Sequence, residues 1–219
     1  MNDSSFVAPI INQLIAQMVY ILSALLFITI IKMSWFKGKV GEFWINTNVK
    51  MRLDEKVYRL IKNVTLPTDD GLTQIDHIVV SVYGVFVIET KNMKGWIFGG
   101  ERQRTWTQKL FKESYKFQNP LFQNYKHTQT LKALLQLSDE QIHSVVAFTG
   151  ESTFKTSMPE NVTQGSGYIS YIKSKTKLVL PESAIQNIIA KIEQERLAPS
   201  FRTDHQHIKR LSEKHSKHF

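Results

Sequence analysis

The chain has 219 residues, 42% of them hydrophobic, which suits one globular domain with an appended segment and excludes a generally disordered chain. It contains no cysteine, which excludes disulfide frameworks, thiolate metal sites and catalytic thiols. The first 31 residues carry only Asp3, so the net charge of +9 becomes 28 − 18 = +10 for the rest of the chain. A surplus of that size is typical of a domain that approaches nucleic acid or anionic lipid.

Residues 10–31 contain no charged side chain and, as a helix, would extend over about 33 Å, roughly the thickness of a bilayer core. No basic segment precedes this stretch and no small-x-small cleavage motif follows it, which argues against a signal peptide. A basic and aromatic stretch, Lys32, Trp35, Lys37 and Lys39, comes next. We therefore predict a single transmembrane anchor within residues 1–33, with the N-terminus outside and the domain inside. A helix lying flat on the membrane or buried in a core is the alternative.

Residues 38–53 are expected to form a helix and residues 57–66 a strand, closed by a turn at 67–71. Residues 74–81 and 85–91 are two further strands, with Gly84 marking the turn between them. A two- or four-residue loop pairs residues whose numbers sum to 165, which places Asp76 opposite Glu89. A three-residue loop would place Glu89 opposite His77 instead.

Directly opposed residues share a face with Cβ atoms about 5 Å apart, so Asp76 and Glu89 would repel each other. A divalent metal ion would remove that conflict. Lys91 lies on the same face as Glu89, because alternate strand residues point the same way, and it suits an anionic substrate. The pattern indicates a metal-dependent phosphodiesterase site. The alternative is a pair of ordinary surface carboxylates with a lysine ion pair. His77 points to the other face and is expected to pack in the core.

Residues 95–98 and 105–107 are predicted short strands, and residues 109–116 a basic loop. A helix is expected from Pro120 to Leu137, because Leu121, Tyr125 and Leu131 recur at helical spacing. Residues 144–149 and 168–172 are predicted strands, and a last helix runs from 182 to about 197. Residues 199–219 form a basic tail rich in His and Lys. The order of elements favours an α/β sandwich.

Several sequence pieces resemble, in order, the NERD (nuclease-related) domain of bacterial proteins, within the PD-(D/E)XK nuclease superfamily. They span residues 38 to about 150, and Ile75-Asp76 stands where the superfamily has Pro-Asp. The pieces are Gly41-Glu42, TQIDH at 73–77, GVFVIETKN at 84–92, Gly95, WTQ at 106–108, QNP at 118–120, Gln123-Asn124 and His127.

The resemblance implies a restriction-endonuclease-like αβββαβ sandwich over residues 34–198, with its core at 38–150. Asp76 and Glu89 would bind Mg²⁺ or Mn²⁺, Lys91 would orient or activate the attacking water, and Glu42 would complete the acidic cluster as a further metal ligand. The expected protein is a nuclease in the bacterial inner membrane, acting in the cytoplasm on DNA before RNA, with paired copies as an option. The alternatives are a non-catalytic nucleic-acid-binding or scaffold module at the membrane, and a nuclease fold acting on a small nucleotide.

A second set of residues is expected to contact nucleic acid around this site. Aromatic residues between the cations, including Trp106, Phe111, Tyr115 and Phe117, either stack bases or belong to the core. The set's last three members, together with Gln123, lie around the start of the predicted helix and are expected to frame the phosphate path beside the site. Ordinary helix capping is the alternative. The set is Gln74, Arg102, Arg104, Lys109, Lys112, Gln118, Asn124 and His127.

Overall fold

The computed structural model describes residues 34–68 and 71–198, together with residues 13, 15, 17–23, 25 and 29. The chain divides into two compact units, Met1–Val40 and Gly41–Phe219, each considered by itself. Among the described residues, no helix combines the length and the apolar character needed to span a bilayer. Most of the expected anchor and all of the expected tail lie outside the described residues, so both stay predictions.

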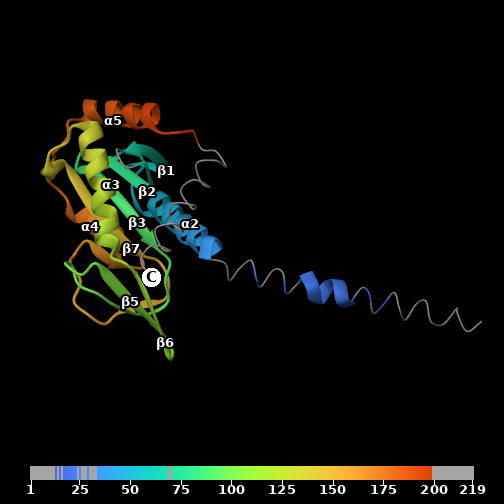
Figure 1. Cartoon of the computed structure of the whole chain (residues 1–219). Coiled ribbons are helices and arrows are strands. Elements are labelled where there is room, and N and C mark those ends of the chain that lie inside the picture. The colour runs from blue at the N-terminus through green and yellow to red at the C-terminus, as the bar shows by residue number, and fades with distance from the viewer. Residues whose placement is uncertain are drawn as a thin grey trace, which may run out of the picture. The chain divides into compact units, whose positions relative to one another are not determined.

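The larger sheet has five strands in the order β1-β2-β3-β7-β9 (Figure 1). β1, β2 and β3 form an antiparallel meander, whereas β7 runs parallel to β3 and β9 runs parallel to β7. Because a parallel partner needs a long crossover, the chain between β3 and β7 builds three strands of a second sheet and a helix. The strands are β1 Arg59–Thr68, β2 Gly71–Ser81, β3 Gly84–Lys91, β7 Ile142–Phe148 and β9 Val162–Gln164.

Helices cover both faces of this sheet. α3 (Pro120–Leu135) and α5 (Glu182–Glu195) pack on the face to which Val85 and Val87 of β3 point. The part of α2 (Ser34–Arg52) that belongs to the larger unit packs with α4 (Gly167–Ser174) on the opposite face, against Phe86 and Ile88. All four of these β3 side chains are fully buried, each contributing about 1.5–3 kcal/mol. The mixed α/β architecture predicted from the sequence is confirmed.

The smaller sheet has the strand order β6-β5-β4-β8. Its strands are β4 Gly95–Phe98, β5 Thr105–Leu110, β6 Glu113–Gln118 and β8 Ser152–Phe154. Ile97 and Trp106 turn inward and pack with Phe148 of β7, and the Trp106 and Phe148 rings are stacked 6.2 Å apart.

Two expected elements are wrong. Residues 109–116 are not a loop, because β5 and β6 pair as a hairpin through this stretch, with Phe111 at φ 51° in its tight turn. Residues 168–172 belong to helix α4 rather than to a strand. Tyr168, Ile169 and Ile172 are buried on one side of that helix. A run this short fits either the helical or the extended period, so sequence alone could not separate them.

Candidate active site

The β2–β3 hairpin sets the register that brings the predicted site together. Its ladder runs from Ser81↔Gly84 to His77↔Ile88, so paired numbers sum to 165, as expected. The two-residue turn is held by the Ser81 hydroxyl, which accepts from the Tyr83 N–H at 3.2 Å and donates to the Gly84 carbonyl at 3.3 Å. Gly84 adopts φ 124°, a conformation open to glycine, which explains how a Val-Tyr turn is tolerated.

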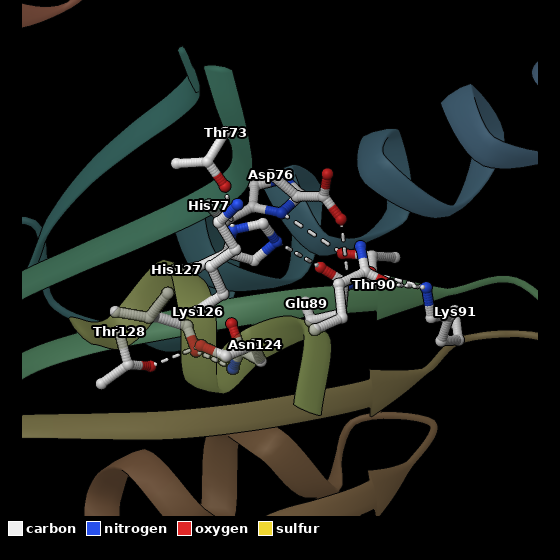
Figure 2. Close-up of polar contacts among 12 residues, drawn as sticks. Thr73, Asp76, His77, Glu89, Thr90, Lys91, Asn124, Lys126, His127 and Thr128 are labelled. Carbon is white, nitrogen blue, oxygen red and sulfur yellow. Dashed lines mark hydrogen bonds and ion pairs between the residues drawn. The ribbon is translucent and has the colours of Figure 1, made fainter. Parts of the chain in front are cut away.

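Asp76 lies one step beyond the last pair of that ladder. Its carboxyl Oδ2 accepts a hydrogen bond from the backbone N–H of Thr90 at 3.0 Å (Figure 2). The Thr90 N–H, immediately past the end of the ladder, thus bonds to a side chain instead of a strand carbonyl. This hydrogen bond fixes the Asp76 carboxyl beside the end of β3. The Thr90 side chain turns to the other face, where its hydroxyl lies 3.4 Å from Nδ1 of the buried His77.

Glu89 and Lys91 meet on the α3 side of β3, as strand alternation predicts. Lys91 Nζ donates to Glu89 Oε1 at 2.6 Å, and the Glu89 side chain is only 3% exposed. Lys91 Nζ also donates to Gln123 Oε1 of α3 at 2.9 Å. The Lys91 side chain remains 20% exposed, so its ammonium group is anchored on one side and open to solvent on the other.

His127 of α3 completes the surroundings of Glu89. Its Nε2 lies 3.3 Å from Glu89 Oε2, and its Nδ1 lies 2.7 Å from the hydroxyl of Thr73. The imidazole therefore lies between β2 and β3, and Figure 2 shows it directed at the Glu89 carboxylate. The geometry of this 3.3 Å contact falls short of a hydrogen bond, so the buried Glu89 Oε2 has a close imidazole neighbour but no well-formed hydrogen bond among the described residues.

The two carboxyls are driven to opposite protonation states. Burial and then the negative charge of Glu89 raise the pKa of Asp76 to about 8. Burial also acts to raise the pKa of Glu89, but Lys91 and then His127 outweigh it and hold that pKa well below its usual range. At neutral pH the pair thus has one ionised carboxylate and one carboxyl that keeps its proton unless a further cation arrives.

Glu42 approaches the same place from α2. A Cβ on the preceding Gly41 would lie 2.9 Å from Asn92 Cβ and 3.2 Å from Thr90 Cγ2, so only glycine lets the helix come this close to the end of β3. The charge of Glu42 acts with that of Glu89 to raise the pKa of Asp76. The end of β3 therefore gathers the predicted catalytic residues from α2, β2 and β3.

The expected participation of Glu42 as a third carboxylate ligand stays a prediction. Within residues 34–68 and 71–198, no three His, Asp or Glu side chains converge closely enough to hold an ion. The smaller set formed by Asp76 and Glu89 nevertheless fits Mg²⁺, which takes one or two carboxylates and keeps several waters. The buried Glu89 Oε2 without a well-formed hydrogen bond and the mutual repulsion of the two carboxyls are both what a cation would relieve.

The residues expected to contact nucleic acid are placed in three different ways. Asn124 is fully buried and donates to Val87 O, Ser144 Oγ and Val145 O at 2.8–3.0 Å, so it ties α3 to β3 and β7 instead of facing a ligand. His127 belongs to the carboxylate site, and half-buried Gln74 lies in β2 opposite Thr65. The others lie in or beside the second sheet: Arg102 and Arg104 before β5, Lys109 within it, Lys112 in the hairpin turn and Gln118 at the end of β6.

Thr73 was missing from the predicted set. Its hydroxyl lies 2.7 Å from Nδ1 of His127, and its place in TQIDH, a piece that carries the family resemblance, was the available signal. Gln123 was expected beside the site because it shares a helix face with His127 at i and i+4, and its Oε1 accepts from Lys91 Nζ.

The fold and this site define a protein of the PD-(D/E)XK-like nuclease class. The chain matches the nuclease-related domain, NERD, over residues 37–149, more than half of its length, and it belongs to that family. It is also similar to an uncharacterized protein of Bacillus anthracis, with 39% identity over 160 residues that cover 70% of this chain and 74% of that protein.

Proposed function

We propose that this protein hydrolyses phosphodiester bonds of nucleic acid, DNA before RNA, in a metal-dependent reaction at the site formed by Asp76, Glu89 and Lys91. The observation that carries the proposal is the 2.6 Å contact between Lys91 Nζ and Glu89 Oε1, buried on the Glu89 side and open on the Lys91 side. Membership of the nuclease-related domain family and a mixed α/β, restriction-endonuclease-like order of elements support it.

Hydrolysis adds water across the diester: the water oxygen bonds to phosphorus, one ester P–O bond breaks, and the departing oxygen takes up a proton. Lys91 suits the attacked phosphate, because its ammonium offsets the negative charge that builds up on the phosphoryl oxygens. Gln123 and Glu89 hold that ammonium in one position, which avoids reorganisation during the reaction.

Glu89 acts as a carboxylate throughout, since its pKa is held well below its usual range. Asp76 and Glu89 would hold Mg²⁺ or Mn²⁺, with Glu42 reaching the ion through water. When bound, the ion would lower the pKa of a water molecule and polarise the phosphoryl oxygen. His127 and Thr73 keep the Glu89 carboxylate in place from the side away from Lys91.

The test uses the full chain in a neutral detergent, incubated with labelled single-stranded and plasmid DNA and with RNA, in Mg²⁺, Mn²⁺ or EDTA. Cleavage is expected with either metal ion, to stop in EDTA, and to fall at least a hundredfold in Lys91→Met. Lys94→Ala is the matched control, because Lys94 is three residues away and its side chain forms an exposed ion pair with Glu151. Binding without cleavage in every metal ion would favour the non-catalytic binding module instead.

We also propose that residues 1–33 anchor the protein in a bacterial inner membrane, with the catalytic unit in the cytoplasm. The support is the uncharged stretch at 10–31 followed by lysines and Trp35. Extraction of membranes at alkaline pH tests it: a spanning segment keeps the chain in the membrane pellet, and release into the supernatant would contradict it.

A further inference from the structure

The outer face of the second sheet carries a compact group of aromatic and basic side chains. Strand register sets this face: Trp96 of β4 lies opposite Lys109 of β5, and Thr107 of β5 lies opposite Lys116 of β6. Because side chains alternate along a strand, these four residues share one face, while Ile97 and Trp106 point inward to the core. The hairpin of β5 and β6 extends to the bottom of the larger unit in Figure 1.

Trp96 is the centre of this face. Its side chain is 48% exposed, in contrast to the fully buried Trp106. Lys155, which follows β8, places Nζ 4.6 Å from the centre of the Trp96 ring, and Lys109 places Nζ 5.9 Å from it. Lys116 Nζ donates to Thr107 Oγ1 at 2.8 Å. An exposed indole held between lysines is thus built into the sheet.

The charged strand residues that share this face are all basic. The structure describes every residue of β4, β5, β6 and β8, and none that shares the face with Trp96 is acidic. Glu113 lies opposite Leu110, at the position whose side chain alternates away from Ser114 and Lys116. The remaining members of the face are neutral: Phe98, Thr105, Ser114, Gln118 and Thr153.

We propose that the outer face of the second sheet binds single-stranded nucleic acid, with one unpaired base stacked on Trp96 and the flanking phosphates paired with Lys109, Lys116 and Lys155. The charge of the face selects a polyanion, and the exposed indole selects a base whose π-face is accessible. In a duplex the bases are already stacked on each other, so Trp96 would contribute nothing there.

In the sequence, the first strand of this face follows the proposed catalytic residues closely. β4 begins four residues after Lys91, and Gln108 of β5 donates to the carbonyl of Lys94 at 2.7 Å, which ties the hairpin to that segment. In this proposal, a strand held on the face continues toward the end of β3. The delivery of a strand to a hydrolytic site rests on the proposed function. The binding of nucleic acid to this face does not, and it can be measured without hydrolysis.

The experiment measures fluorescence anisotropy of a labelled oligothymidylate of about 15 nucleotides. The full chain is used, in neutral detergent with EDTA so that no cleavage occurs. Trp96→Ala should weaken binding about tenfold and Trp96→Phe much less, because a phenyl ring still stacks. Tyr115→Ala is the matched control, since Tyr115 is also 48% exposed but lies on the other face of the same sheet, in β6. Replacing both Lys109 and Lys155 by Ala should lower the slope of log K against log salt by about 1.4.

Equal affinities of Trp96→Ala and Tyr115→Ala for the oligonucleotide would overturn the proposal. So would an equal loss on single-stranded and duplex DNA, which indicates a phosphate site without stacking, or a loss confined to phosphatidylserine vesicles, which indicates a lipid-facing sheet. Glu89→Gln separates the two hypotheses: it should bind the oligonucleotide like the unaltered protein while losing cleavage. If Glu89→Gln still cleaved DNA while Trp96→Ala lost binding, the proposed hydrolytic site would be wrong and the proposed binding face would be supported.

Discussion

His127 Nε2 and Glu89 Oε2 lie 3.3 Å apart, in a place where neither side chain is more than 6% exposed. Lys91 holds the other oxygen of the same carboxylate at 2.6 Å. Glu89 is therefore fixed from both sides, by a cation that reaches solvent and by an imidazole that does not. The arrangement keeps one carboxylate charged inside the protein, which costs several kcal/mol without such partners.

Removing the imidazole is expected to impair the site without removing the fold. His127→Ala leaves Glu89 Oε2 and the Thr73 hydroxyl without their neighbour. We expect cleavage to fall about 10–100-fold and the Mg²⁺ concentration for half-maximal rate to rise, because partners that orient a metal-binding carboxylate have effects of this size. The measurement is the initial rate as a function of Mg²⁺.

Tyr125→Ala is the control for this substitution, since Tyr125 lies on the same helix and is 63% exposed. It should change neither the rate nor the metal requirement. A His127→Ala protein with the Mg²⁺ dependence of the unaltered chain would show that the imidazole does not position Glu89.

Asn124 is expected to matter for stability instead of nucleic-acid binding. Its amide donates to Val87 O, Ser144 Oγ and Val145 O from a fully buried position. Asn124→Ala should lower the free energy of unfolding by about 1–3 kcal/mol, because buried acceptors lose their donor. Urea denaturation measures this, and oligonucleotide affinity at low temperature should be unchanged. Asn48→Ala removes one hydrogen bond within α2, from the Asn48 side-chain amide to the Trp44 carbonyl, and it should cost less than about 0.5 kcal/mol. Equal costs would contradict the role assigned to Asn124.

The stability of the metal-free protein should fall as pH rises from 5 to 8. The pKa of Asp76 is raised to about 8, so the folded protein keeps a proton there that the unfolded chain has already lost above pH 4. Glu89, whose pKa is lowered, is ionised in both states over this range and contributes no slope. The full effect of such a shift is about 1.36 kcal/mol per pH unit, or roughly 4 kcal/mol from pH 5 to 8. Since Asp76 is half-buried, we expect a smaller total loss of about 1–3 kcal/mol over this range.

Asp76→Asn is the control for that pH dependence, because an amide does not titrate. Its free energy of unfolding should lack this part of the slope, and Mg²⁺ should stabilise the unaltered chain at pH 8 more than it stabilises Asp76→Asn. Parallel curves for the two proteins in EDTA would contradict the raised pKa.

Gly41 should tolerate no side chain. A Cβ there would meet Asn92, Thr149 and Thr90 at 2.9–3.2 Å, so Gly41→Ala would push α2 from the end of β3 and take Glu42 with it. We expect a loss of about 1–3 kcal/mol in the free energy of unfolding and a lower cleavage rate. Gly38→Ala is the matched control, because nothing lies within 4 Å of its Cβ position and alanine favours the helix by about 1 kcal/mol. A Gly41→Ala protein as stable and active as Gly38→Ala would show that the close approach is not needed.

The placement of the proposed catalytic residues could be predicted because it depends on local rules. Alternation puts Glu89 and Lys91 on one face, and the short turn before Gly84 sets the register that brings Asp76 to the end of β3. The bond from the Thr90 N–H to Asp76 arises at the last step of the ladder, and no local pattern reports where a ladder stops.

The contributions of distant elements were harder to predict. Gln123 and His127 act on β3 from a helix about 35 residues later, and helical spacing alone does not distinguish a polar face that caps from one that enters a site. Trp106 and Trp96 illustrate the same problem in the second sheet. Both lie in short strands, and only the packing against Phe148 decides that one is buried and the other exposed.

The most direct test of the hydrolytic site compares Glu89→Gln with the unaltered full chain in one experiment that records both DNA binding and DNA cleavage in Mg²⁺. Glutamine has nearly the same shape as glutamate but no charge. We therefore predict unchanged affinity for DNA together with a loss of cleavage of at least a hundredfold. Cleavage by Glu89→Gln at the rate of the unaltered chain would contradict the assignment of this carboxylate, and with it the proposed active site.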